Sequence, residues 1–180
     1  MIQVAGAFGI QAGVVAADSA MHRQLVVVCG LKAEVERAGR MHGLGTARVA
    51  ARRSRTGAES PGESLLRLVA EDLGYDVELQ FPVAGPDGVP FAYADLRLTG
   101  TRSLLEFDGA IKYEGACGRQ ALVAEKERED RIRRLGWGLE RVIWSDLAAC
   151  RTQHAHRRGC APHRVNRASR QQAAGSRQRA

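Results

Sequence analysis

Residues 91–113 have the sequence FAYADLRLTGTRSLLEFDGAIKY, which predicts a β-hairpin with strands over 91–99 and 102–108. Gly100-Thr101 is expected to form a two-residue type II′ turn, because glycine is favoured at its first central position. Apolar residues alternate along both strands, as they do in strands that bury one face. The face expected to pack against the core carries Leu96, Leu98, Leu105 and Phe107.

The opposite face of this hairpin concentrates negative charge. In the predicted register Asp95 lies directly opposite Glu106, with their Cβ atoms about 4.5–5.5 Å apart. Asp108 follows Glu106 on the same face, because side chains alternate along a strand. Like charges that face each other destabilise a sheet, and Mg²⁺ compensates them because it binds through one or two carboxylates. With Lys112 just beyond the strand, the pattern predicts the metal site of a phosphodiester hydrolase.

The elements around the hairpin predict an α+β fold. Ser60 is expected to cap a helix, and Glu63 to complete a capping box. A strand over 76–82 precedes the hairpin, a helix over 121–135 follows it, and a strand over 138–144 comes last. The order helix, three strands, helix, strand indicates a mixed β-sheet flanked by helices.

Three regions are expected along the chain. Residues 1–57 predict a small helical segment, with helices over 12–21, 31–38 and 44–52. Residues 22–30 between the first two are either a short buried strand or a packed connector. Residues 58–147 form the α+β domain, which is expected to end in a helical turn capped by Ser145. Residues 148–180 have no apolar periodicity, which predicts a disordered tail.

The net charge of +7 and the pI of 9.8 arise almost entirely from this tail. Residues 148–180 hold eight of the 27 Lys and Arg residues and no Asp or Glu, which leaves residues 1–147 with 19 basic and 20 acidic side chains. An argument for nucleic-acid binding from overall charge therefore applies only to the tail.

Size and composition indicate a water-soluble protein. The chain has 180 residues, of which 44% are hydrophobic and 26% are charged. It contains no apolar run of the roughly 18 residues needed to span a membrane, and its first residues lack the basic region of a signal peptide. The four cysteines show no close paired spacing, so a reduced, cytoplasmic location is expected.

A series of short motifs carries a family resemblance: SPGES at 60–64, Asp95, EFDG at 106–109, EKERED at 125–130, LGW at 135–137 and RVIWSDL at 141–147. In this order they resemble the uncharacterised restriction-endonuclease-like proteins common in actinobacteria. These are related to very-short-patch repair endonucleases and belong to the PD-(D/E)xK superfamily. The resemblance covers about residues 58–147 and implies a restriction-endonuclease-like fold.

Residues 12–55 also resemble the segment that precedes this domain in such proteins. In that group the segment follows a winged-helix region like that of AbiEi-type antitoxins. The chain is expected to start inside that region, without its DNA-reading helix.

The resemblance assigns roles to individual residues. Asp95 matches the motif aspartate, Glu106 the acidic residue of the (D/E)xK motif, and Glu63 a helix acid that often completes the metal site. The site implied is therefore Glu63, Asp95 and Glu106 around one Mg²⁺ or Mn²⁺, with DNA as substrate. The third motif position departs from the pattern, because it is Asp108 rather than lysine. Lys112 or Lys126 is expected to supply the missing cation, and Asp108 to bind the metal or position the water.

Plainer interpretations stand beside these. Asp95 and Glu106 also suit a solvated strand face neutralised by Arg97, and Glu63 suits a helix cap without a metal. The charges of 121–135 suit a solvated helix face, to which Lys126 and Arg128 are the first candidate exceptions. The alternative functions are a non-catalytic DNA-binding or antitoxin-like regulator with a degenerate nuclease fold, and a truncated product without independent function.

Overall fold

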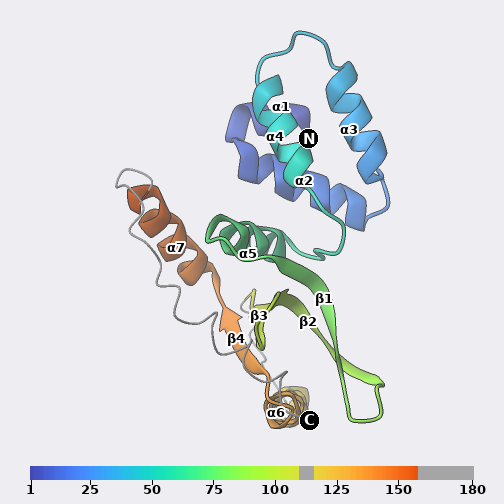
Figure 1. Ribbon diagram of the computed structural model, residues 1–180, viewed down its shortest axis with the longest axis vertical. Coiled ribbons are helices and arrows are strands. Elements are labelled where there is room, and N and C mark those ends of the chain that lie inside the picture. The colour runs from blue at the N-terminus through green and yellow to red at the C-terminus, as the bar shows by residue number, and fades with distance from the viewer. Residues whose placement is uncertain (110–115, 158–180) are drawn as a thin grey trace, which may run out of the picture.

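The protein is an α+β structure with a single mixed sheet (Figure 1). The computed structural model describes residues 1–109 and 116–157. Within these ranges the chain forms seven helices and a four-stranded sheet. Its strands lie in the order β1 (Val77–Ala84), β2 (Pro90–Leu98), β3 (Ser103–Phe107) and β4 (Gly138–Val142). Strands β1, β2 and β3 are antiparallel neighbours, whereas β4 pairs in parallel with β3. The predicted mixed sheet flanked by helices is confirmed.

Helices and strands follow one another in two groups. The first group is α1 (Ile2–Phe8), α2 (Ile10–His22), α3 (Val28–Arg37) and α4 (Leu44–Arg53). The second is α5 (Pro61–Asp72), β1 (Val77–Ala84), β2 (Pro90–Leu98), β3 (Ser103–Phe107), α6 (Ala116–Arg134), β4 (Gly138–Val142) and α7 (Trp144–Arg157). Its first six elements have the predicted order of helix, three strands, helix and strand.

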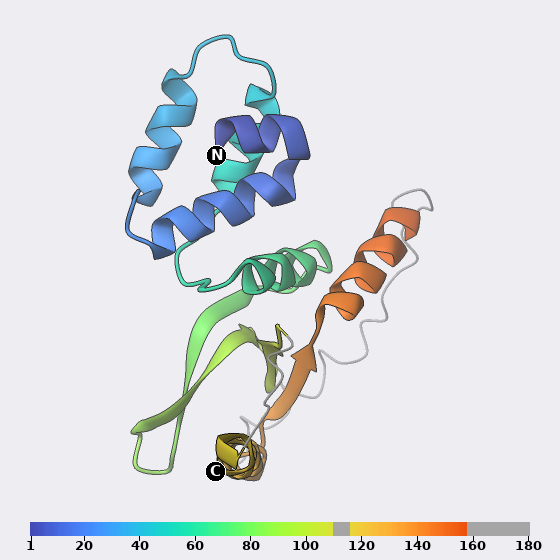
Figure 2. The same cartoon turned by 180° about the vertical axis from the view of Figure 1, so that it is seen from behind.

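The N-terminal helices pack on each other above α5 (Figures 1 and 2). The three predicted helices appear as α2, α3 and α4, whereas α1 was not predicted. Helix α1 depends on tertiary contact: a Cβ on Gly43 would lie 2.3 Å from the Cα of Gly6 in α1, so a glycine at position 43 permits this approach. The residues before α3 form a connector rather than a strand, and Val26 packs partly against the helices.

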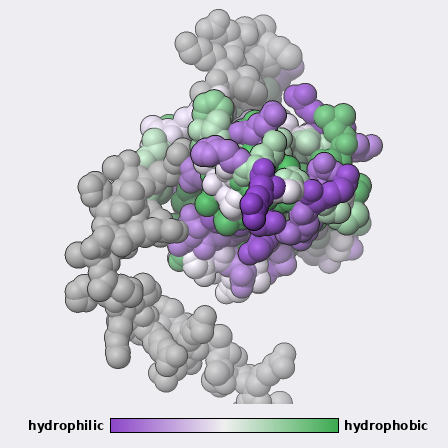
Figure 3. Space-filling model, turned by 90° about the horizontal axis from the view of Figure 1, so that it is seen from above, coloured by the Kyte–Doolittle hydropathy of each residue, from purple (hydrophilic) through white to green (hydrophobic). Residues whose placement is uncertain are grey.

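The outer face of these helices is a mixed surface. Figure 3 looks onto this end of the molecule, where apolar side chains are interspersed with hydrophilic ones. Phe8, Leu25 and Val27 are among the exposed apolar residues. None of the described helices combines the length and the apolar character that a membrane-spanning helix requires.

Two apolar clusters lie on opposite faces of the sheet. One joins α5 and α7 to the sheet through Leu66, Ala70, Val77, Leu96 and Leu147. The other joins α6 to it through Val83, Ala92, Ala94, Leu104, Ile132 and Leu139. Burial of both faces explains why Leu104 is fully buried, although two-residue alternation puts it on the same face as Glu106.

The hairpin turn differs from the prediction, although the register does not. Leu96 pairs with Leu105 and Leu98 with Ser103, as expected. The loop, however, spans four residues, and the N–H of Thr101 donates to the carbonyl of Leu98. Gly100 is then the second central residue of the turn, with φ of 78°, a position that also requires positive φ. Both turns conserve the register, which is why the strand pattern could not distinguish them.

A kink in β1 exchanges the two faces of the hairpin. Gln80 has φ of 51° in the middle of the strand, and Asp95 lies across from it between the pairs Leu79–Leu96 and Phe81–Ala94. Leu79 and Leu96 belong to the cluster under α5, whereas Phe81 and Ala94 belong to the cluster over α6. Simple two-residue alternation therefore fails at Gln80 and Asp95.

Helix α7 extends beyond the predicted end of the domain. Asp146, rather than Ser145, caps it by accepting a hydrogen bond from the N–H of Ile143. The helix continues to Arg157, although the sequence shows no apolar periodicity after Leu147. Once Leu147 packs against the α5 cluster, each added residue extends a formed helix, which costs less than nucleation. Residues 158–180 lie outside the described residues.

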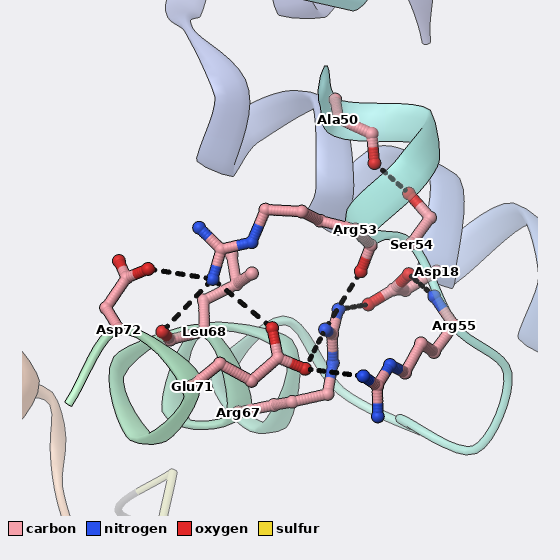
Figure 4. Close-up of polar contacts among 9 residues, drawn as sticks. All are labelled: Asp18, Ala50, Arg53, Ser54, Arg55, Arg67, Leu68, Glu71 and Asp72. Atoms are coloured by element: carbon pink, nitrogen blue, oxygen red, sulfur yellow. Dashed lines mark hydrogen bonds and ion pairs between the residues drawn. The ribbon is translucent and has the colours of Figure 1, made fainter. Parts of the chain in front are cut away.

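A buried ion cluster connects the two groups of elements (Figure 4). Arg67 of α5 and Asp18 of α2 have exposed fractions of 0% and 1%, and the Arg67 Nη2 donates to the Asp18 Oδ2 at 2.8 Å. The Arg67 Nη1 donates to the carbonyl of Arg53 and to Glu71. The other oxygen of Asp18 accepts from the N–H of Arg55. The cluster fixes α5 against α2 and holds the chain between α4 and α5.

We expect Asp18→Ala to lower the free energy of unfolding by about 3 kcal/mol, because a buried guanidinium that loses its partner is strongly destabilising. Urea denaturation measures the change. Glu36→Ala is the matched control, since its pair with Arg48 is 3.6 Å long and exposed, and its loss is expected to cost less than about 1 kcal/mol. Equal effects of the two substitutions would show that the buried pair does not hold α5 against α2.

Candidate functional site

Asp95 lies in β2 at the end of the β2–β3 ladder. The last regular pair is Leu96 with Leu105. Beyond it the Asp95 side chain replaces the ladder, because its Oδ2 accepts a 2.8 Å hydrogen bond from the backbone N–H of Phe107. Asp95 and Glu106 therefore lie on adjacent strands where the regular pairing ends, and the Asp95 carboxylate points toward β3.

Acidic groups surround Asp95. Its pKa is raised from 3.8 to about 6, mainly because burial disfavours the charged carboxylate. The N–H of Phe107 opposes this rise, and the negative charges of Glu63, Glu106 and Glu59 add to it, in that order. Side chains from α5, β3 and the loop before α5 thus act on one carboxyl group.

Glu63 lies at the N-terminus of α5 and is 7% exposed. Its N–H donates to the Ser60 Oγ at 3.2 Å, so the predicted cap is present. Its Oε2 accepts from the N–H of Glu59 at 2.8 Å, one residue before the position of a regular capping box. The same oxygen lies 3.4 Å from the amide nitrogen of Gln80, at the kink opposite Asp95. Glu63 therefore caps its helix, and its negative charge also raises the pKa of Asp95.

Gly62 allows α5 to come this close. A Cβ at this position would lie 2.0 Å from the Phe107 ring, so any side chain would push the helix N-terminus away from β3. Phe107 in turn stacks edge-on against Trp144 at 4.7 Å. The glycine of the SPGES motif thus positions Glu63 over the end of the strand that carries Glu106.

Glu106 is held by an arginine. Its two oxygens each accept a 2.9 Å hydrogen bond from the Arg128 guanidinium of α6. Arg128 also donates from Nε and Nη2 to Glu125, one turn earlier in the same helix. Its pKa is raised by the hydrogen bonds to Glu125 and Glu106. Such two-pronged pairs are among the strongest that carboxylates form.

The network continues into β4 through Arg141, which pairs in register with Glu106. Arg141 contacts Glu125 and lies 3.9 Å from the Glu106 Oε2 and 3.7 Å from Glu129. The pKa of Glu125 is lowered, chiefly by its hydrogen bond from Arg128. Two arginines from different elements therefore converge on the acidic side chains at this end of β3.

The remaining predicted residues take different positions. Asp108 follows β3, is exposed, and donates its N–H to the carbonyl of Val142. Lys112 lies outside the described residues. Lys126 is exposed on α6, two positions before Arg128. Arg97, considered as a neutralising partner for Asp95 and Glu106, instead pairs with Glu78.

A pocket opens beside this network. Its lining includes Glu106, Asp108, Glu125, Arg141 and Leu122. Both acidic and basic groups therefore border one accessible space at the end of β3.

The donor chemistry fits a divalent cation, since Glu63, Asp95 and Glu106 offer only carboxylate oxygens, the ligands that Mg²⁺ prefers. The geometry adds one condition. Among the described residues, no group of three His, Cys, Asp or Glu side chains is arranged to hold a metal ion. The bidentate contact with Arg128 occupies the two Glu106 oxygens. A cation at these oxygens would therefore compete with this guanidinium.

Sequence reasoning missed Glu125 and Arg141. The spacing of Glu125 and Arg128 on a predicted helix was a usable signal, because residues three apart share a helix face. The approach of Arg141 to Glu106 gave no such signal, since it depends on the parallel register of β3 and β4.

No protein-family model matches the chain, and no curated protein or solved structure shows significant similarity to it. The functional argument therefore rests on the residues and geometry described above.

We expect Asp95→Asn to stabilise the protein above pH 6. The folded-state pKa of Asp95 exceeds its ordinary value, so the stability contributed by its protonation is complete below about pH 4 and is lost as the pH rises through about 6. Between pH 4 and 7 the variant should gain on the order of 1 kcal/mol relative to the wild type, less than two full pKa units imply, because solvent screens this half-buried group.

Urea denaturation of both proteins at pH 4, 5, 6 and 7 measures this difference. Asparagine retains an oxygen that can accept from the Phe107 N–H, so the substitution removes the titration with little other change. Parallel stability curves across this range would contradict a raised pKa.

Proposed function

We propose that the protein is a metal-dependent endonuclease that hydrolyses phosphodiester bonds in DNA. The observation that carries this proposal is the convergence of Glu63, Asp95 and Glu106, which come from α5, β2 and β3. The negative charges of both glutamates contribute to the raised pKa of Asp95. The two glutamates lie 32 and 11 residues from Asp95 along the chain, so the fold, rather than the local sequence, brings their charges to this half-buried aspartate.

The fold supports the same proposal. The elements from α5 to β4 all lie within residues 58–147, the region that resembles restriction-endonuclease-like proteins. Strand β3, which carries Glu106, is the inner strand between β2 and β4. The site thus lies on a rigid element, while α5 and α6 contribute from the two faces of the sheet.

Each residue has a definite task in this mechanism. Glu63, Asp95 and Glu106 would hold the ion, and Asp95 would have to lose its proton first, which favours activity above pH 6. When bound, a divalent cation polarises the phosphoryl oxygen and increases the acidity of a water. Among the described residues, Arg128 and Arg141 contact Glu106 or lie close to it, so they are better placed than Lys126 to stabilise the negative charge that develops at the phosphate.

A plasmid-cleavage assay with Mg²⁺ or Mn²⁺ tests this function. The wild type should nick supercoiled DNA only when a divalent metal is present, and Glu106→Gln should reduce the rate by at least about a hundredfold, the usual effect of removing a key electrostatic contact in a site. Its circular dichroism spectrum should be unchanged. The absence of nicking by the wild type under all metal conditions would overturn the proposal.

Glu140→Gln is the matched control for this assay. Glu140 is an exposed acid of β4 and pairs in register with Leu105, next to Glu106. Removing its charge should leave the cleavage rate within about twofold, since surface substitutions have small effects. If both variants lose activity equally, the effect comes from general charge rather than from the site.

One observation favours a second candidate function. Arg128 already neutralises Glu106, and the motif lysine is replaced by Asp108. A non-catalytic DNA-binding protein with a degenerate nuclease fold would have such a self-neutralised site. This alternative predicts DNA binding without nicking, and equal thermal stability with and without Mg²⁺.

A further inference from the structure

The contact between Arg128 and Glu106 has a specific chemical character. A guanidinium covers both oxygens of the carboxylate at 2.9 Å. The same planar fork binds a phosphate group equally well, because carboxylate and phosphate present oxygens at similar spacing. Arg128 is therefore suited to exchange one oxyanion for another.

The surroundings make this exchange feasible. The Arg128 side chain is 26% exposed, whereas Glu106 is 14% exposed. The adjacent pocket is bordered by Glu106, Glu125 and Arg141. A phosphate entering that pocket would meet Arg141 at its wall, next to Glu106, whose oxygens bind Arg128. Glu125 remains bound to Arg128 from the same helix, so the arginine would stay in place while it changes partner.

We propose that Arg128 makes metal binding at Glu106 conditional on a nucleic-acid phosphate. Without substrate the guanidinium occupies both Glu106 oxygens and competes with a divalent cation. A backbone phosphate takes the guanidinium and releases the carboxylate to the metal. This inference rests on the proposed function and adds its regulation: the metal ion binds tightly only when a nucleic-acid substrate is bound.

The proposal has a thermodynamic consequence. If phosphate and metal each favour the same rearranged state, each must increase the affinity of the other by the same factor. The coupling should vanish when Arg128 is removed, because Glu106 is then available from the start. Direct binding measurements can therefore test the proposal without any cleavage.

The experiment titrates Mn²⁺ into the protein and follows free Mn²⁺ by electron paramagnetic resonance. Wild type alone should bind Mn²⁺ weakly, and saturating single-stranded oligonucleotide should tighten this binding about tenfold, within the usual range of coupling between sites. Arg128→Gln should bind Mn²⁺ about tenfold more tightly than wild type in the absence of DNA, with no further gain from the oligonucleotide. Glu106→Gln with the same oligonucleotide gives the background from Mn²⁺ on DNA.

Two further variants complete the design. Arg133→Gln is the matched control, because Arg133 lies on the same helix, is exposed and pairs with Glu129; its Mn²⁺ affinity should equal that of the wild type. Arg128→Lys keeps the charge but lacks the fork that covers both oxygens, so it should be intermediate. This variant decides the question if Arg128→Gln does not fold in a thermal melt.

The outcomes separate the two proposals. Equal Mn²⁺ affinity of wild type and both Arg128 variants without DNA, with clear binding above background, would overturn the conditional mechanism and leave the endonuclease function standing. No Mn²⁺ binding above background by any of these proteins, with or without oligonucleotide, would overturn the metal-dependent function itself.

Discussion

The buried guanidinium of Arg67 is the constraint on which the arrangement of this protein depends. It is fully enclosed, and its charge is met by Asp18 from one layer and Glu71 from its own helix. A buried charge of this kind does little for net stability but is very costly to leave unpaired. Arg67 therefore specifies where α5 sits against α2, and α5 is the helix that brings Glu63 to the end of β3.

Local backbone strain at the centre of the sheet also helps to position the candidate site. Gln80 adopts a left-handed conformation that a non-glycine residue rarely takes, and Asp95 opposite it leaves the regular ladder. Such strain persists only where the surrounding packing imposes it. Here the two apolar clusters on opposite faces impose it, because the hairpin must supply Leu96 to one and Ala94 to the other. The kink also turns the Asp95 carboxylate toward its acidic neighbours.

The sequence predicted those parts of the fold that depend on local pattern. The strand alternation determined the β2–β3 register, and Ser60 marked the start of α5. Features that depend on distant contacts were missed, among them α1, the kink at Gln80 and the continuation of α7. The candidate site shows the same division. Short motifs indicated Asp95, Glu106 and Glu63, but the ion pair of Glu106 required α6 to pack against β3, which no local pattern specifies.

The ion pairs formed by Arg67 and by Arg128 differ in their access to solvent. The pair of Arg67 and Asp18 is sealed from solvent, so it has no competing partner and acts as a fixed joint. The pair of Arg128 and Glu106 is 26% and 14% exposed, and Glu106 lines a pocket. The exchange of partners that we propose requires this access to solvent, which the pair of Arg67 and Asp18 lacks. Burial, rather than the identity of the residues, separates a structural ion pair from one that can take part in function.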